Sequence, residues 1–149
     1  MKSPHRIRLA GPWSLIANRG TPDEVVMPLK FPATWPAMPG RTAGRAHLSR
    51  AFKKPTGLSE HHRVVLCIDH DRSVQECSLN KVPLSMNEPH HQQNDFCALG
   101  KWDVLEHLQQ QNLLLLTVAV PKMITPMSIL AIEVWLEIQQ PNEGVMDGT

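Results

Sequence analysis

The segment of residues 130–138 most constrains the fold, because its apolar residues recur at every second position. The apolar positions are Leu130, Ile132, Val134, Leu136 and Ile138. The positions between them are mixed and include Glu133 and Trp135. This period matches a β-strand with one buried face, since successive side chains of a strand point to opposite faces of the sheet. The 13 Pro residues argue in addition against long helices, because Pro breaks helix interiors.

Several other segments also predict strands. Residues 64–69 are a short β-branched run typical of a central strand, and residues 74–80 place Cys77 and Leu79 on one face and Glu76 and Ser78 on the other. Further strands are expected at residues 45–54 and, broken at Gly11-Pro12, at residues 7–16. About eight short strands with almost no helix are typical of an all-β fold, an antiparallel β-sandwich or jelly roll.

Two segments are less clear from periodicity. Residues 113–120 are apolar on both faces, which fits a strand covered on both sides or a helix, but the β-branched end and Pro121 favour a strand. Residues 103–111 predict one or two helical turns, with Asp103 as the N-cap and Glu106 three residues on. We expect loops at residues 21–44 and 83–95. We expect the chain to form a single β-sandwich domain over residues 1–140, followed by a flexible C-terminal tail over residues 141–149.

Charge and hydropathy exclude several classes of protein. The net charge is only +1, so we expect no nucleic-acid partner, because such proteins carry a basic footprint. The longest apolar run, residues 113–120, is far shorter than the roughly 18 residues that span a bilayer, so we expect no membrane partner and a cytoplasmic location. Residues 1–63 hold 11 Lys/Arg and 3 Asp/Glu, whereas residues 64–149 hold 4 and 11. We expect these charges to pair within the fold.

The cysteines and histidines do not form a recognisable catalytic or metal motif. Three Cys residues without C-x-x-C spacing predict neither a disulfide framework nor a Cys-based zinc site, and Cys67 and Cys77 fall on core-like strand positions. The pairs His61-His62 and His90-His91 lie in expected loops, and no H-x-x-x-H spacing occurs. We expect no metal and no cofactor.

The order of the segments resembles the N-terminal sugar-binding domain of family 2 glycoside hydrolases, the β-galactosidase and β-glucuronidase group. The landmarks in chain order are a Pro-x-x-Trp segment (31–35), a Gly-x-x-x-aromatic-x-Arg-x-Phe strand (44–52), a strand pair ending in Val-x-Leu-Asn-Gly (63–80), a Phe-x-x-Asp-[Val/Ile]-Thr-x-x-Leu stretch (96–108), an Asn-x-Leu strand start (112–114) and a closing strand (128–138). Lys81 replaces the usual turn Gly after Asn80, so this hairpin must adopt a positive φ without Gly or use another turn type.

The resemblance implies a galactose-binding-like jelly roll that carries no chemistry, because the family's catalytic glutamates lie in a separate barrel. A barrel of this kind takes about 200 residues or more, so we expect no enzyme activity. The implied function is a carbohydrate-binding-like domain; the alternative is a protein-interaction or oligomerisation module without a sugar ligand. The partners would be a saccharide, a protein or a second copy of the chain. The candidate ligand-binding residues are Trp35, Trp102, Asn80, Asp69, Asp71, His90 and His91.

Overall fold

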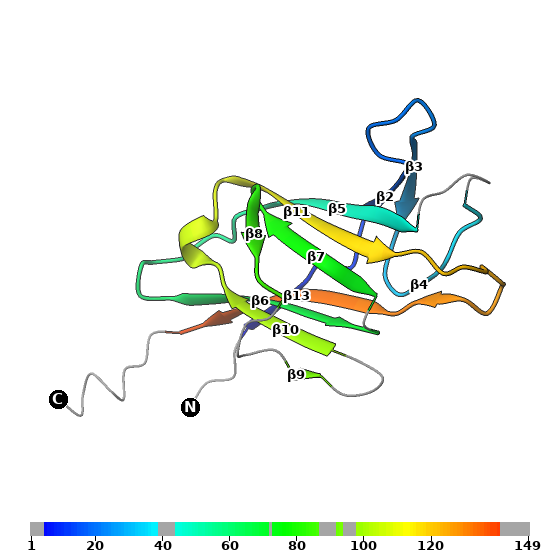
Figure 1. Cartoon of the computed structure of the whole chain (residues 1–149). Coiled ribbons are helices and arrows are strands. Elements are labelled where there is room, and N and C mark those ends of the chain that lie inside the picture. The colour runs from blue at the N-terminus through cyan, green and yellow to red at the C-terminus, as the bar shows by residue number, and fades with distance from the viewer. Residues whose placement is uncertain (1–4, 39–43, 72, 87–91, 94–97, 141–149) are drawn as a thin grey trace.

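The computed structural model describes residues 5–38, 44–71, 73–86, 92–93 and 98–140 of the 149-residue chain. These residues form strands joined by short connections and a single 3-10 turn (Figure 1). The elements in order are β1 (His5–Arg8), β2 (Trp13–Ala17), β3 (Val25–Leu29), β4 (Ala33–Thr34), β5 (Arg45–Lys53), β6 (Arg63–His70), β7 (Val74–Leu79), β8 (Val82–Leu84), β9 (Gln92–Gln93), β10 (Ala98–Asp103), η1 (Leu105–His107), β11 (Gln111–Ala119), β12 (Ile129–Leu130) and β13 (Ile132–Gln139).

Two antiparallel sheets face each other. One sheet, called here the β6 sheet, has the strand order β1-β13-β6-β10-β9, and the other, the β11 sheet, has the order β3-β2-β5-β11-β7-β8. A small ladder pairs β12 with β4 at one end of the molecule. Figure 1 shows β5, β11 and β7 layered over β13, β6 and β10. The predicted all-β antiparallel sandwich is therefore confirmed.

The core lies between the two sheets and follows the alternation of the strands. In β11, Leu114 and Leu116 are fully buried whereas Leu113 is 49% exposed. In β13, Val134 and Leu136 face the same core. Burying one face of each sheet against the other removes apolar surface from water at roughly 25 cal/mol per Å², and this is the main source of stability.

Most of the expected strands are confirmed. The run at residues 64–69 lies in β6, in the middle of its sheet, and residues 113–120 form a strand rather than a helix. The alternating segment at residues 130–138 is divided between two strands, β12 and β13, which are separated by Ala131. The expectation that both faces of residues 113–120 are covered is wrong, because Leu113 points outward.

Two expectations about irregular segments are also wrong. The predicted helix at residues 103–111 is only η1, with Val104 at its N-cap position and no side-chain cap, because Asp103 ends β10. The segments expected as loops contain β3 and β4 in one case and β8 and β9 in the other. Pro28 and Pro83 obscured these strands. Both lie in edge strands, where a missing N–H is tolerated.

The hairpin between β7 and β8 shows how the chain accommodates Lys81 at a turn position where Gly was expected. Leu79 pairs with Val82, so the loop consists of Asn80 and Lys81, whose φ angles are 52° and 69°. Two successive positive φ angles are the geometry of a type I′ turn. Lys81 therefore adopts the left-handed conformation that Gly would adopt more readily.

The outer face of the β6 sheet carries a second apolar cluster, separate from the core. Its members are Val65, Cys67 and Trp135, with Leu99 packed against them. The Arg6 guanidinium lies 5.0 Å from the centre of the Trp135 ring. The Trp135 indole donates a hydrogen bond to Glu137. Trp135, which the alternation places on a mixed face, is thus only 7% exposed.

Ion pairs on the same face link the two parts of the chain. Arg6 lies 3.4 Å from Glu137, and Arg63 lies 3.2 Å from Asp103. Each pair joins a basic residue of residues 1–63 to an acidic residue of residues 64–149. The expected pairing of charge within the fold is found at these positions. Separately, no helix among the described residues has the length and apolar character needed to cross a membrane.

Candidate functional site

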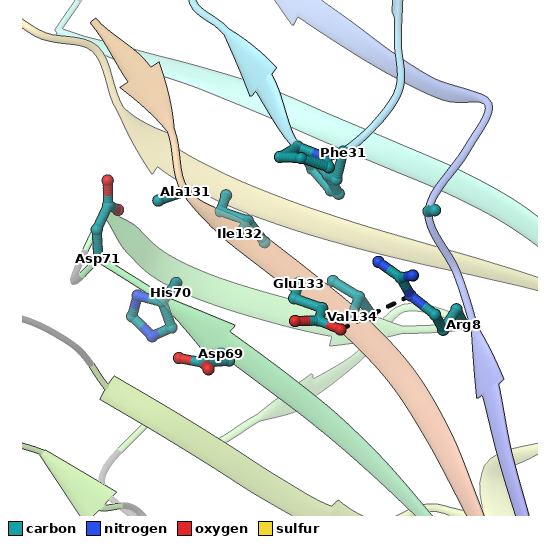
Figure 2. Close-up of a pocket in the computed structure, with 11 residues that line it drawn as sticks. Arg8, Phe31, Asp69, His70, Asp71, Ala131, Ile132, Glu133 and Val134 are labelled. Carbon is teal, nitrogen blue, oxygen red and sulfur yellow. Dashed lines mark ion pairs between the residues drawn. The ribbon is translucent and has the colours of Figure 1, made fainter.

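A cleft opens where β6 ends and β13 begins, at the edge of the β6 sheet. It has a volume of about 410 Å³ and is called here the acidic cleft. Figure 2 shows the side chains around it. The lining residues are Arg8, Ala10, Phe31, Pro32, Asp69, His70, Asp71, Ala131, Ile132, Glu133 and Val134. Two of the predicted site residues, Asp69 and Asp71, are among them.

The register of the sheet places two carboxylates side by side in the acidic cleft. Asp69 of β6 lies directly opposite Glu133 of β13, and both alternate outward from the core. Like charges directly opposite each other on a sheet destabilise the pairing. A cation, Arg8 of β1, offsets this repulsion in part, with its Nε 3.7 Å from Glu133 (Figure 2). Both side chains of that pair are more than half exposed, so the ion pair is weak.

The turn after β6 fixes the third carboxylate. The Asp71 N–H donates to the carbonyl of Ala131, and one carboxylate oxygen of Asp71 accepts from the Ser73 N–H. His70, only 4% exposed, accepts a hydrogen bond from the Val74 N–H at Nδ1. Asp71 is thus held in a hydrogen-bonded turn, with its second oxygen outside that bond.

The opposite wall of the acidic cleft is apolar. Phe31 lies across from Asp69 and Asp71 in Figure 2 and packs on Trp13, with ring centroids 5.1 Å apart. Ile132 forms part of the floor. The cleft therefore combines an apolar wall with carboxylates that accept hydrogen bonds and one guanidinium that donates them. This is chemistry suited to a ligand with hydroxyl groups and apolar C–H surface.

The two predicted tryptophans lie in the core and not in the acidic cleft. Trp35 is 6% exposed and Trp102 is 5% exposed. The Trp102 indole donates to the Ser85 carbonyl at 2.8 Å, and the Trp35 backbone N–H donates to the Ser128 carbonyl at 2.9 Å. Both rings therefore pack the sandwich and offer little surface to a ligand.

Asn80 has a structural partner for each of its polar atoms. Its amide nitrogen donates to the His107 carbonyl and to the Asn112 side chain, both at 2.9 Å. Its amide oxygen accepts from the Leu113 N–H at 2.8 Å. Asn80 thus ties its hairpin to the start of β11. The remaining predicted residues, His90 and His91, lie outside the described residues.

The described part of the chain holds no group of three or more His, Cys, Asp or Glu side chains placed to bind a metal ion. Its two thiols are unsuited to nucleophilic catalysis. Burial raises the pKa of Cys67 to about 12, with a further rise from Glu137, and burial raises the pKa of Cys77 to about 12. The thiolate is the reactive form, so both groups stay protonated near neutral pH.

Sequence reasoning missed Arg8, Phe31 and Glu133. Glu133 belongs to a strand whose outer face reads as ordinary solvent-exposed charge. Its position opposite Asp69 depends on the register of β13 against β6, which no local pattern encodes. The feature that identifies the site is the placement of two carboxylates opposite each other on paired strands, and this placement can be seen only in the fold.

Comparison with known proteins gives a likeness of fold. No protein-family model matches the chain, and no curated protein matches it. The FMN-binding β-glucuronidase from Facaelibacterium prausnitzii L2-6 has a similar structure, with a TM-score of 0.62 and 16% identity over 91% of this chain and 23% of that chain. The Bifidobacterium dentium β-glucuronidase, solved with coumarin-3-O-glucuronide, has a TM-score of 0.61 and 14% identity over 95% of this chain and 31% of that chain.

The likeness is to one part of each enzyme. The chain spans less than a third of the length of either β-glucuronidase. At these identities the similarity concerns the fold alone. The expected resemblance to a domain of family 2 glycoside hydrolases is thus supported at the level of a shared β-sandwich fold.

Proposed function

We propose that the chain is a non-catalytic carbohydrate-binding-like domain, related to the galactose-binding-like jelly roll at the N-terminus of family 2 glycoside hydrolases. The observation that supports this most is the structural match of 91% of this chain to only 23% of a β-glucuronidase. Fold alone does not specify function. The carboxylates and the guanidinium of the acidic cleft provide further support for a saccharide ligand.

In this proposal a saccharide binds in the acidic cleft. Its hydroxyl groups donate hydrogen bonds to Asp69 and Asp71, because ionised carboxylates only accept hydrogen bonds. Arg8 donates to a ring or hydroxyl oxygen, and the C–H face of the sugar packs on the exposed apolar surface of Pro32 and Ala131. Asp69 and Asp71 are thus the two sequence-predicted residues that the proposal retains as ligand contacts.

Saccharide titration by calorimetry tests the proposal, with galactosides, glucuronides and mannosides as the panel. We expect one of these to bind, and Asp69→Asn and Asp71→Asn each to weaken binding at least about 10-fold, the loss of roughly 1.4 kcal/mol. Asp103→Asn is the matched control, because Asp103 is an exposed carboxylate of the same sheet outside the acidic cleft. Absence of binding across the panel, or equal weakening by all three variants, contradicts the proposal.

A second candidate, a protein-interaction module, rests on a different surface. Met123 is 77% exposed, Met127 is 85% exposed and Ile129 is 58% exposed, all within the connection from β11 to β12 or its end. Exposed apolar side chains that gather in one segment are typical of interaction sites. If this function holds, sedimentation shows a concentration-dependent oligomer that Met127→Glu abolishes. A monomer at all concentrations contradicts self-association.

A further inference from the structure

A second cleft crosses the outer face of the β11 sheet, on the other side of the sandwich from the acidic cleft. Its volume is about 570 Å³, and it is called here the transverse cleft. The side chains that matter for its chemistry are Arg19, His47, Glu76, Ser78, Leu115 and Thr117. None of them belongs to the acidic cleft, and the proposed function makes no use of them.

The strand register arranges these residues in a row. Thr117 of β11 lies opposite His47 of β5 on one side and opposite Glu76 of β7 on the other. Neighbouring strands lie about 4.8 Å apart, so this polar row is about 10 Å long. Leu115 lies two residues before Thr117 on the same face of β11. It is opposite Ser78 and adds an apolar patch beside the polar row. A floor of this size suits a ligand as large as a monosaccharide.

The two ends of the transverse cleft differ in charge. Arg19 follows β2, which neighbours β5, so the guanidinium and His47 lie toward one end and Glu76 lies toward the other. The Thr117 hydroxyl donates to Glu76 at 3.4 Å and fixes the acidic end. The ion pairs among the described residues involve Arg6, Arg8 and Arg63, but not Arg19 or Arg45.

Burial and neighbouring charges both act on His47, which lies at one end of the transverse cleft. Its pKa lies below the ordinary value of 6.5, mainly because of burial and then because of Arg19. Arg45, on the same strand, lowers the pKa further, and only Glu76 raises it. His47 is therefore neutral near pH 7. The neighbouring guanidinium groups of Arg19 and Arg45 form no ion pair with a carboxylate of the described residues.

We propose that the transverse cleft binds a phosphorylated polyol, with the phosphate at Arg19 and His47 and the hydroxyl groups at Glu76 and Ser78. Arg matches the geometry of phosphate oxygens with paired N–H donors, and a phosphate monoester carries a charge of about −1.5 to −2 at pH 7. Arg19, which no carboxylate of the described residues pairs in the cleft, and the nearby His47 favour such an anion over a carboxylate, which carries a single charge. Glu76 at the far end accepts hydrogen bonds from hydroxyl groups.

Binding is linked to protonation of His47. A phosphate beside the imidazole favours the imidazolium, so the complex takes up a proton that the free protein lacks. The charged groups that face His47 are Arg19, Arg45 and Glu76. Because the bound phosphate favours the imidazolium, the pKa of His47 should rise when the ligand binds.

The test is an NMR titration of isotopically labelled protein with glucose 6-phosphate, inorganic phosphate, gluconate and glucose. We expect glucose 6-phosphate to bind most tightly, to shift the His47 ring signals and to raise the pKa of His47 in the complex. Arg19→Gln, in an exposed connection, weakens it at least about 10-fold. Arg63→Gln, an exposed arginine outside both clefts, is the matched control and leaves it unchanged.

Three results overturn the proposal. The first is that glucose 6-phosphate leaves the His47 signals unmoved. The second is that glucose or gluconate shifts the His47 signals at the same concentration as glucose 6-phosphate. The third is that Arg19→Gln retains wild-type affinity for glucose 6-phosphate while the spectrum shows an intact fold. These outcomes are independent of the acidic cleft, because that site is tested with Asp69→Asn and with neutral saccharides.

Discussion

The two outer faces of the sandwich use charge in opposite ways. On the β6 sheet, Arg6 packs on Trp135 and pairs with the 94%-buried Glu137, so the charges mostly satisfy one another. On the β11 sheet, Arg19 and Arg45 have no carboxylate within ion-pair distance among the described residues. Paired charges around a buried aromatic ring stabilise the fold. Unpaired charges beside a cleft are available to a ligand.

The acidic cleft is the exception on the β6 sheet. Asp69 and Glu133 lie opposite each other, and Arg8 forms an ion pair with Glu133 but not with Asp69. Repulsion of this kind lowers stability, and proteins tolerate unfavourable local arrangements at functional sites. The contrast between the paired and the unpaired charges of one face therefore separates structural residues from candidate binding residues.

The largest effect is expected at the paired end of the β6 sheet. Trp135→Ala removes the ring that covers Cys67 and leaves Glu137 without one partner, so it should lower the free energy of unfolding by about 3 kcal/mol. Leu113→Ala, on the exposed side of β11, should cost less than about 1 kcal/mol. Urea denaturation measures both. Equal costs would show that the outer cluster is not a structural unit.

A somewhat smaller effect is expected at Asn80. Asn80→Ala leaves the Asn112 side chain and the His107 carbonyl short of a donor and places Ala at a positive φ, so the loss of stability should be about 2 kcal/mol. Ligand affinity at either cleft should not change. A selective loss of saccharide binding with unchanged stability would return Asn80 to the candidate site.

A reversed sign is expected at Asp69. Asp69→Asn removes the repulsion with Glu133 and should raise the free energy of unfolding by about 0.5 kcal/mol while it weakens saccharide binding. Calorimetric unfolding and saccharide titration on the same sample give the two numbers. A variant that is less stable than the wild type would mean that Asp69 holds the fold together.

The smallest effect is a pH dependence on the β11 sheet. The pKa of His47 is lowered in the folded state, so the unfolded chain takes up a proton first as the pH falls below about 6.5, and stability declines through this window. His47→Gln should flatten that part of the stability curve relative to the wild type. If the two curves run parallel between pH 7 and pH 5, the positive potential assigned to this face is absent.

The fold was largely predictable because its strands carry a strong period of two. The alternation at residues 130–138 and the β-branched run of β6 need only local sequence to be recognised. β3 and β8 were missed because Pro28 and Pro83 imitate loop sequence, and only their edge positions make them strands. The helix expected at Asp103 failed because pairing of β10 with β6 continues through that residue.

The candidate site was predictable only in part. Of the predicted ligand-binding residues, Asp69 and Asp71 lie in the acidic cleft. Its other charged residues, Arg8 and Glu133, come from β1 and β13, which long-range pairing brings beside β6. Trp35 and Trp102 look like ligand-binding aromatics in sequence, because Trp35 lies in a Pro-rich segment and Trp102 follows Gly100 and Lys101. Packing between the sheets buries both. The burial of a ring is a property of the whole sandwich and not of its local sequence.

Separate binding sites on the two faces are tested most directly by titrating one labelled sample in turn with a neutral saccharide that binds and with glucose 6-phosphate. We predict that the saccharide shifts the backbone signals of Asp69, Asp71 and Glu133, whereas the phosphate ester shifts those of Arg19 and His47. If both ligands shift one common set of residues, or if the saccharide leaves the acidic cleft unperturbed, the assignment of separate functions to the two faces is contradicted.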